Sequence, residues 1–593
     1  MITLKNKFPQ LLLAVFTCIF FFSCQKDLNH VSVDSNSADL ITKVTSSVSG
    51  FVTNENNLAV LGANVSVGGT NVITDKYGYF EVKNVQVVKN AAVVTVTNPG
   101  YFKGIKTWAA TIGKSAFFRI KLIPKTNSGS INAAAGGNVT LTNGLVISLP
   151  ANAVVNAATN TTYNGNINVA AFWINPAAND LDLIMPGDLR GIDDAGSLKG
   201  LTTFGMAAVE LTGISGELLQ IAPGKKATLT IPLPNGGATT FPSSIPLWSF
   251  EETKGLWKQE GEATKTGSAY IGEVNHFSFW NVDLPNAIVP LTFTIVDANG
   301  NPLNNIYFDI VPLNPNPSWA HITGGTDPSG YVSTYVTPNT QYDLHLTFTS
   351  TTCILSFVQT FSVGATAVNL GNAIIPAANT ANITGTVKDC SNAALNNGHI
   401  IVQEANWYSS YPITNGTFNF TRPVCNVATN INIIAVDLTT LQQSTPLAIT
   451  LAPGPNNAGN LQACSLITQE FISYTVNGGT LNSLTSPSCI FNYGLYGSNT
   501  TGIVVVRNGS NEAVTLSYDN TGIAQGTVQN LIKFQGTIFN DSTNILTPIG
   551  INITEYGSVG QYIAGNFSGI LTGWQPPNNV YNVSCNFRVK RSY

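Results

Sequence analysis

Short runs of alternating apolar and polar residues cover most of this chain, and clusters of turn residues separate them. An early run at residues 49–53 (SGFVT) is followed by a polar turn at residues 54–57, and similar runs occur at residues 93–96, 471–476 and 514–518. A period of two places successive side chains on opposite faces of a strand. The pattern therefore predicts an all-β chain of short strands, arranged as β-sandwich domains in series.

The first apolar run differs from the others because it is continuous. Residues 10–22 are mostly apolar, follow Lys5 and Lys7, and lead directly to Ser23 and Cys24. The run is too short to span a bilayer comfortably. The whole segment resembles the signal peptide of a bacterial lipoprotein (residues 1–23).

This resemblance implies that a peptidase cuts before Cys24 and that acyl chains are then attached to its side chain and new N-terminus. Several acyl chains on one residue hold a protein at a membrane far better than a single chain does. The family usually has leucine three positions before the cysteine, where this chain has Phe21. The alternative is an uncleaved N-terminal anchor helix.

The residues after Cys24 bear on localisation. Gln25, Lys26 and Asp27 are similar to the charged segment of surface-exported lipoproteins of the Bacteroidetes type. The resemblance implies a lipid-anchored outer-membrane protein at the cell surface, with the periplasm-facing leaflet as the alternative. Residues 24–46 are polar and are predicted to tether the lipid to the first domain.

Length and charge narrow the possibilities further. A chain of 593 residues is long enough for about four domains. Charged residues make up only 10% of it, its formal net charge is −4, and it has no basic block, which argues against nucleic acid as a partner. No apolar run after Cys24 approaches the ~18 residues that a membrane-spanning helix needs.

One strand–turn–strand unit occurs three times, with the turns TDKYG at residues 74–78, TDPSG at 326–330 and TNG at 414–416. The first unit resembles the carboxypeptidase regulatory-like domain, a small transthyretin-like β-sandwich. Three such sandwiches are predicted, and we expect them to be independent and to form a rod that stands off the membrane. Their expected bounds are 47–125, 288–376 and 377–465.

The segment 127–287 has a different and more specific set of motifs. They include GLVISLPANAVV at residues 144–155, IPLWSF at 245–250 and NHFSFWN at 275–281. The set resembles the extracellular β-sandwich of ZU5-type and FAM171-type proteins. This resemblance implies an interaction or structural module and supplies no catalytic residues. Residues 466–593 are predicted to form a last β domain.

Three tryptophans of this segment, Trp248, Trp257 and Trp280, lie on runs of strand character. We favour a place in the sandwich core, where each indole N–H needs a hydrogen-bond partner. The alternative is an exposed aromatic platform on which sugar rings stack.

Cysteines suggest disulfides, because an exported protein meets an oxidising environment. Cys18 lies in the predicted signal, and six cysteines lie in the C-terminal half. We prefer Cys390 with Cys425 and Cys489 with Cys585, whereas the partners of Cys353 and Cys464 stay open. The chain has no C-x-x-C motif and no histidine at ligand spacing from a cysteine, so a metal site of this kind is not expected.

Acidic residues offer the best candidates for binding calcium. A dense cluster lies in the second domain, and three further acids lie at predicted turns. Capping of turns is the favoured interpretation of both sets, because neither has the spacing of a known calcium loop. The cluster is Asp180, Asp182, Asp188, Asp193 and Asp194, and the turn acids are Asp75, Asp297 and Asp327.

The sequence contains no recognisable catalytic motif. G-x-S-x-G, H-E-x-x-H and phosphate-binding loops are absent, and the five histidines are scattered over separate segments. We therefore expect a non-enzymatic exported binding or structural and adhesive module without a cofactor, with a protein or glycan ligand. The alternatives are a glycan-binding accessory lipoprotein for nutrient uptake and an enzyme with a dispersed site. The histidines are His30, His276, His321, His345 and His399.

Overall fold

Strands make up nearly all of the regular structure in the computed structural model, and α2 (Leu181–Ile184) is the helix among the described residues. This confirms the predicted all-β fold class. Cys24 and its signal lie outside the described part, in which no helix is long and apolar enough to cross a membrane. The structure describes residues 39–591 except 99, 235–240, 350–353, 377–379, 406, 425–427, 439–441, 465–469, 478–481, 486–488, 496–498, 508–512, 525, 537–538, 540–542, 560–561 and 574–578.

The first sandwich consists of a three-stranded sheet in the order β4-β1-β7 and a four-stranded sheet in the order β3-β2-β5-β6. Strand β1 pairs antiparallel with β4 and parallel with β7. Alternate residues such as Val65, Val94 and Val96 fill the space between the sheets. The strands are β1 (Lys43–Thr53), β2 (Asn64–Val67), β3 (Thr70–Ile73), β4 (Tyr79–Val88), β5 (Ala92–Thr97), β6 (Gly104–Trp108) and β7 (Ser115–Lys121).

The same topology recurs in the third and fourth sandwiches. The third has sheets β24-β21-β27 and β23-β22-β25-β26, and the fourth has sheets β31-β28-β34 and β30-β29-β32-β33. The third contains β21 (Val289–Asp297), β22 (Tyr307–Pro312), β23 (Ile322–Gly325), β24 (Tyr331–Val336), β25 (Gln341–Thr349), β26 (Ile354–Ser362) and β27 (Val368–Ile375). The fourth contains β28 (Thr380–Lys388), β29 (Gly398–Glu404), β30 (Trp407–Pro412), β31 (Thr417–Pro423), β32 (Thr429–Asp437), β33 (Leu447–Leu451) and β34 (Gly454–Gln462).

A glycine in the turn before the fourth strand of each sandwich explains why the turn motif repeats. Gly78, Gly330 and Gly416 have φ angles of 74°, 63° and 69°. A Cβ atom at Gly78 would lie 2.3 Å from the carbonyl oxygen of Val52, and one at Gly330 would lie 2.4 Å from that of Ile295. The turn therefore needs both the left-handed conformation and the close approach that glycine allows.

Acids at these turns cap them, as the favoured interpretation predicts. The Asp75 carboxylate accepts the backbone N–H of Tyr77 at 2.9 Å, and that of Asp327 accepts the N–H of Ser329 at 2.9 Å. Asp297 caps the first loop of the third sandwich in the same way. Each carboxylate therefore provides a hydrogen-bond acceptor for a backbone N–H group of its turn.

The second domain is a strongly interconnected set of 13 strands, in which the long strand β14 pairs with β12, β13, β15 and β20. Its strands are β8 (Asn127–Asn132), β9 (Gly137–Thr140), β10 (Val146–Leu149), β11 (Val154–Asn156), β12 (Asn166–Ile174), β13 (Arg190–Ile192), β14 (Leu198–Gly213), β15 (Leu218–Ile221), β16 (Ala227–Pro232), β17 (Ser244–Glu251), β18 (Leu256–Thr266), β19 (Ala269–Val274) and β20 (Phe279–Asn286).

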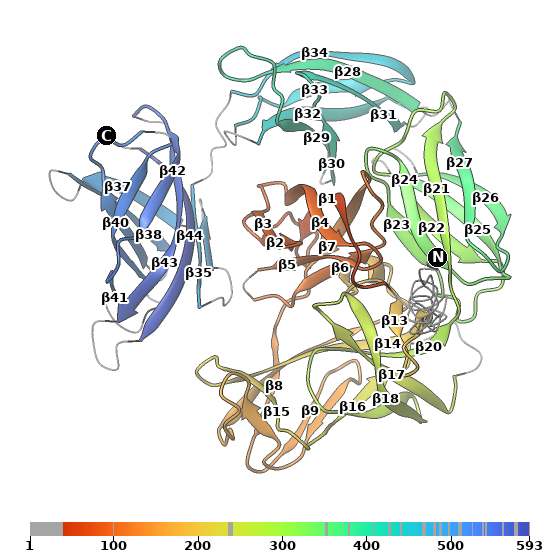
Figure 1. Ribbon diagram of the computed structural model, residues 1–593. Coiled ribbons are helices and arrows are strands. Elements are labelled where there is room, and N and C mark those ends of the chain that lie inside the picture. Colours follow the sequence, from red (N-terminus) through yellow and green to blue (C-terminus); the bar gives the residue numbers. More distant parts are fainter. Residues whose placement is uncertain are drawn as a thin grey trace, which may run out of the picture.

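The C-terminal domain has ten strands, drawn in blue in Figure 1, and a core that contains Tyr474, Tyr518 and Phe534. Strands β43 and β44 pair antiparallel along most of their length. The strands are β35 (Phe471–Val476), β36 (Asn482–Thr485), β37 (Cys489–Leu495), β38 (Thr500–Arg507), β39 (Ala513–Asp519), β40 (Val528–Gly536), β41 (Thr543–Asn544), β42 (Gly550–Tyr556), β43 (Tyr562–Gly573) and β44 (Val580–Lys590).

The first four units do not form a straight row. Figure 1 shows the first sandwich between the second, third and fourth. On the outer face of its β4-β1-β7 sheet, Phe51, Tyr79 and Phe117 pack against Ile401 and Ile434 of the fourth sandwich. The expectation of independent sandwiches in a rod is therefore wrong. Strand β1 buries side chains on both faces, one in its own core and one against a distant part of the chain.

Candidate functional site

The five acids proposed for calcium make separate contacts. Asp180 pairs with Lys121 at 2.9 Å and Asp188 with Arg190 at 2.7 Å. Asp193 accepts the backbone N–H groups of the turn that follows it. Within the described ranges, no three His, Cys, Asp or Glu side chains lie where they could hold a metal ion. The structure thus does not unite Asp180, Asp182, Asp188, Asp193 and Asp194 in one site.

The three tryptophans of the second domain lie in its interior. Trp248, Trp257 and Trp280 are each 0% exposed, which confirms the core interpretation. Their indole N–H groups donate to the carbonyl oxygens of Asp283, Asp188 and His276 at 3.2, 3.0 and 3.0 Å. These residues cannot provide a sugar-stacking platform.

The described histidines lie in separate places. His276 contacts Glu260 at 3.0 Å in the second domain, whereas His321 contacts Asp309 at 2.8 Å in the third. His399 is buried in the fourth sandwich against the first. His345 is on β25, and His30 lies outside the described residues. His276, His321 and His399 thus belong to three different domains, and His345 lies opposite Asp309 in the same domain as His321.

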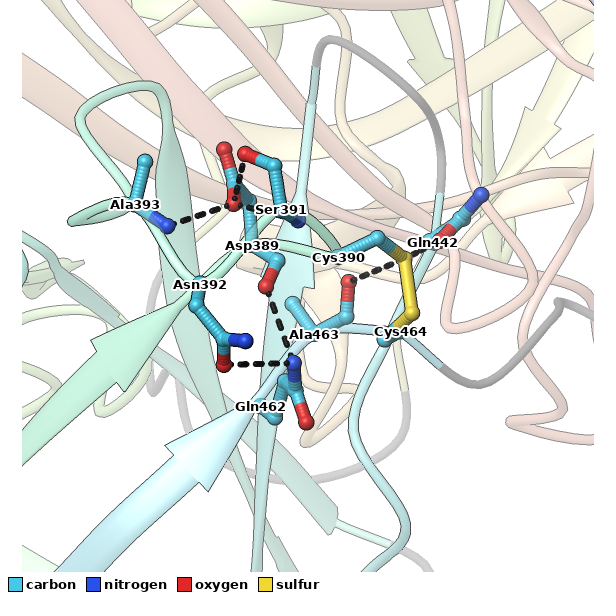
Figure 2. The surroundings of a disulfide bond; sticks show 9 residues. All are labelled: Asp389, Cys390, Ser391, Asn392, Ala393, Gln442, Gln462, Ala463 and Cys464. Atoms are coloured by element: carbon cyan, nitrogen blue, oxygen red, sulfur yellow. Dashed lines mark hydrogen bonds between the residues drawn. A yellow bond between two sulfur atoms is a disulfide. The ribbon is translucent and has the colours of Figure 1, made fainter.

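A disulfide joins Cys390 to Cys464, with their Cα atoms 4.7 Å apart, so the predicted pair of Cys390 with Cys425 is wrong. Strands β28 and β34 are parallel neighbours in which Lys388 is opposite Gln462. Each cysteine follows its strand by two residues, so the pairing of the strands places the two thiols together, as Figure 2 shows.

The other predicted pair is also wrong, because Cys489 and Cys585 are free and buried. Strand β37 pairs with β38, whereas β44 pairs with β35 and β43, so no ladder aligns the two cysteines. Burial raises the pKa of the Cys585 thiol. Cys353 and Cys425 lie outside the described residues.

A cavity of about 760 Å³ lies where the first, second and third sandwiches meet. Its wall comes from β6 and β7 of the first sandwich, from β22, β23 and β24 of the third, and from residues 176–190 of the second, here called the cavity loop. Interfaces between domains are common places for ligand sites, and such sites usually measure about 300–1,000 Å³.

Lys106 on β6 holds the cavity loop in place. Its ammonium group donates to the carbonyl oxygens of Asp182 and Met185, both at 2.6 Å. Burial lowers the pKa of Lys106 to about 8. The N–H of Gly187 in turn donates to the carbonyl of Ile105 at 2.9 Å. The loop is therefore fixed to the first sandwich through its backbone.

Two hydrogen bonds help to hold the third sandwich against this assembly. The connection between β22 and β23 inserts Trp319 into the core of the second domain, where its indole N–H donates to the carbonyl of Thr203 at 2.9 Å. On the other side, the hydroxyl of Ser115 in β7 donates to the carboxylate of Asp327. Three domains thus form one continuous wall.

Arg190 is the most buried charge in the cavity loop, with 4% of its surface exposed. Its Nε donates to Asp188 at 2.7 Å and its Nη1 to the carbonyl of Asn90 at 2.6 Å. The ring of Tyr335 on β24 covers the guanidinium at 4.8 Å. Burial raises the pKa of the Asp188 carboxyl, although Arg190 acts against that rise. A carboxylate, a backbone carbonyl and an aromatic ring therefore hold the guanidinium of Arg190 in place.

Sequence reasoning missed this cavity. No pattern in the sequence singled out Lys106, Arg190, Trp319 or Tyr335. A signal existed at residues 104–108 (GIKTW), where a lysine stands inside an otherwise uncharged strand of a chain with only 10% charged residues. A charge in such a place needs a specific partner.

Comparisons with known proteins give limited overlap. No protein-family model matches the chain. A stretch of 110 residues is 30% identical to human cartilage intermediate layer protein 2, covering 18% of this chain and 9% of that protein. Among solved structures, the Bacillus anthracis TIE protein is 10% identical over 71% of this chain and 50% of that one, with a TM-score of 0.15.

Pilins are also among the similar structures. The shaft pilin SpaA of Lactobacillus rhamnosus GG is 12% identical, with a TM-score of 0.16, over 30% of this chain and 99% of that one. The major pilin BcpA of Bacillus cereus is 14% identical, with a TM-score of 0.12, over 56% and 99%. Because these TM-scores are low, the all-β assignment rests on the strands and sheets described above.

Proposed function

We propose that this chain is an exported, non-catalytic module that holds or binds other components at the cell surface. The packing of the first sandwich against the second, third and fourth supports this role, because it turns four sandwiches into one preformed body. Trp319 and the cluster around Phe51 are the contacts that carry the argument. A rigid body presents the same surface at each encounter and loses little conformational entropy on binding.

The proposed attachment is an acylated Cys24 in the outer membrane, with the cell surface as the location and the periplasm-facing leaflet as the alternative. Its support is the order of cationic, apolar and small residues before Cys24. Cells that carry the native chain should incorporate labelled palmitate into it, and cells with Cys24→Ser should not. Protease added to intact cells should digest the native chain. If the chain survives this protease treatment, the alternative location in the periplasm-facing leaflet is favoured.

Attachment of intact cells to glass under flow tests the structural and adhesive role. Three strains are needed: one with the native chain, one with Cys24→Ser and one without the chain. We expect attachment to fall to the same low level in the last two, because an unanchored chain cannot transmit force. Equal attachment of all three strains would reject an adhesive role.

A further inference from the structure

Several buried polar atoms in the wall of the interdomain cavity have no hydrogen-bond partner among the described residues. They include Nη2 of Arg190, Oδ1 of Asp188 and Nε1 of Trp108. Arg190 and Trp108 are only 4% and 8% exposed. An unpaired buried polar atom destabilises the fold. The residues that line the cavity therefore include at least two donors and one acceptor without a partner.

Aromatic rings lie in the same wall. Tyr335 covers the guanidinium of Arg190, and Tyr331 lies 5.2 Å from the Lys114 ammonium. Tyr307 is 38% exposed. Partly exposed tyrosines combine a flat apolar face with a hydroxyl group, so they can contact both the C–H face and the hydroxyl groups of one ligand.

Charges in the wall are nearly balanced. Its cationic side chains are Lys106, Lys114, Arg119 and Arg190, its carboxylates are Asp182, Asp188 and Asp327, and it also contains His321. Lys106 is satisfied by two carbonyl oxygens, and Arg190 is paired with Asp188. Lys106 and the Arg190–Asp188 pair therefore offer little attraction to an ionic ligand. This balance favours a neutral ligand that is rich in both donors and acceptors.

We propose that the cavity binds a short neutral saccharide of about two or three rings. Sugar hydroxyls donate and accept hydrogen bonds, so a saccharide matches a wall that has unpaired donors and acceptors. A pyranose also has an apolar C–H face that fits a tyrosine ring. The 760 Å³ volume lies within the usual range for a small-molecule site. This site goes beyond the proposed surface role and does not depend on it.

An array of neutral and sialylated di- and trisaccharides, probed with the purified full chain, tests the proposal. We expect retention of at least one neutral saccharide, followed by a measurable dissociation constant in titration calorimetry. Tyr335→Ala should weaken that constant by tenfold or more. Retention of none of the neutral sugars, or a preference for the sialylated ones, would overturn the proposal.

A variant that fills the cavity tests where the saccharide binds and leaves Arg190, Asp188 and Trp108 unchanged. Ser333 on β24 lines the cavity, so Ser333→Trp should abolish saccharide binding. Ser356 is exposed on β26 of the same sandwich and does not line the cavity, so Ser356→Trp should leave binding unchanged. Thermal melting of both variants shows that each is folded. Full binding by folded Ser333→Trp would place the saccharide elsewhere and overturn the proposal.

Discussion

Arg119 in the first sandwich donates a hydrogen bond of 2.8 Å to the carbonyl oxygen of Tyr408, which lies 289 residues further along in the fourth. The same guanidinium lies 5.1 Å from the Phe51 ring, 5.6 Å from the Phe117 ring and 5.3 Å from the Trp407 ring. Burial lowers the pKa of Arg119 to about 10, so the group stays charged at neutral pH. One side chain thus joins two domains by a hydrogen bond and by stacking.

Arg119→Lys should lower the free energy of unfolding by about 1–3 kcal/mol, because an ammonium group lacks the planar face that stacks on aromatic rings. Urea denaturation at neutral pH measures the change. Lys226→Arg, at an exposed position of the second domain, is the matched control and should unfold like the native chain. Unfolding of Arg119→Lys at the control midpoint would mean that this contact does not stabilise the interface.

The disulfide should stabilise the chain by closing a loop of 74 residues. Replacing Cys390 and Cys464 together by serine should cost about 4 kcal/mol in the chain-entropy model. Alkylation in denaturant without reductant, followed by peptide mapping, checks the pairing. Peptides with Cys489 and Cys585 should be alkylated, and those with Cys390 and Cys464 should be linked. A peptide that links Cys390 to Cys425 would contradict the structure.

Asp75 and His399 face each other across the interface of the first and fourth sandwiches, with Oδ2 and Nε2 3.9 Å apart. Burial raises the pKa of Asp75 to about 7 and lowers that of His399 to about 3, so both are favoured in their neutral forms. The unfolded pKa values are 3.8 for Asp75 and 6.5 for His399. The raised pKa of Asp75 therefore makes the fold less stable as the pH rises, and the lowered pKa of His399 makes it less stable as the pH falls.

These two effects oppose each other between pH 4 and 6.5, so the pair should contribute little pH dependence there. Asp75→Asn keeps an oxygen for the turn and leaves His399 as the only member of the pair that titrates. Its stability should rise by up to about 5 kcal/mol between pH 3 and 6.5. His399→Phe should do the reverse and lose about 4 kcal/mol between pH 4 and 7. Urea midpoints at several pH values test this, and parallel profiles for the two variants would refute it.

Two glycines of the third sandwich allow the cost of a left-handed backbone conformation to be measured apart from the cost of steric crowding. Gly330 and Gly300 have φ angles of 63° and 83°, but a Cβ meets the carbonyl of Ile295 at 2.4 Å only at Gly330, and nothing within 4 Å at Gly300. Gly300→Ala should cost about 1–2 kcal/mol for the left-handed conformation. Gly330→Ala should cost clearly more. Equal melting temperatures for the two variants would remove the steric argument.

Much of the local structure followed from the sequence. The alternating runs predicted strands, and the repeated TDxxG turns at residues 74–78 and 326–330 predicted hairpins with capping acids. Trp248 was correctly placed in a core. The disulfide partner was not found, because proximity of Cys390 to Cys464 depends on the parallel pairing of β28 with β34. No local pattern encodes which strands become neighbours.

Alternation and turn chemistry act within a few residues, so the amino-acid order by itself determined that this chain consists of strands, hairpins and tryptophan-filled sandwiches. The tertiary structure alone decided that the fourth sandwich packs on the first and that Arg190, Trp108 and Tyr335 border one cavity. Phe51 illustrates the reason: it shares its face of β1 with Ser47, Ser49 and Thr53, so the sequence does not mark that face as buried. Only the docking of the fourth sandwich, with Ile401 lying 350 residues further along the chain, decides what Phe51 contacts. Contacts over such separations depend on the complementarity of whole surfaces, which no stretch of sequence displays.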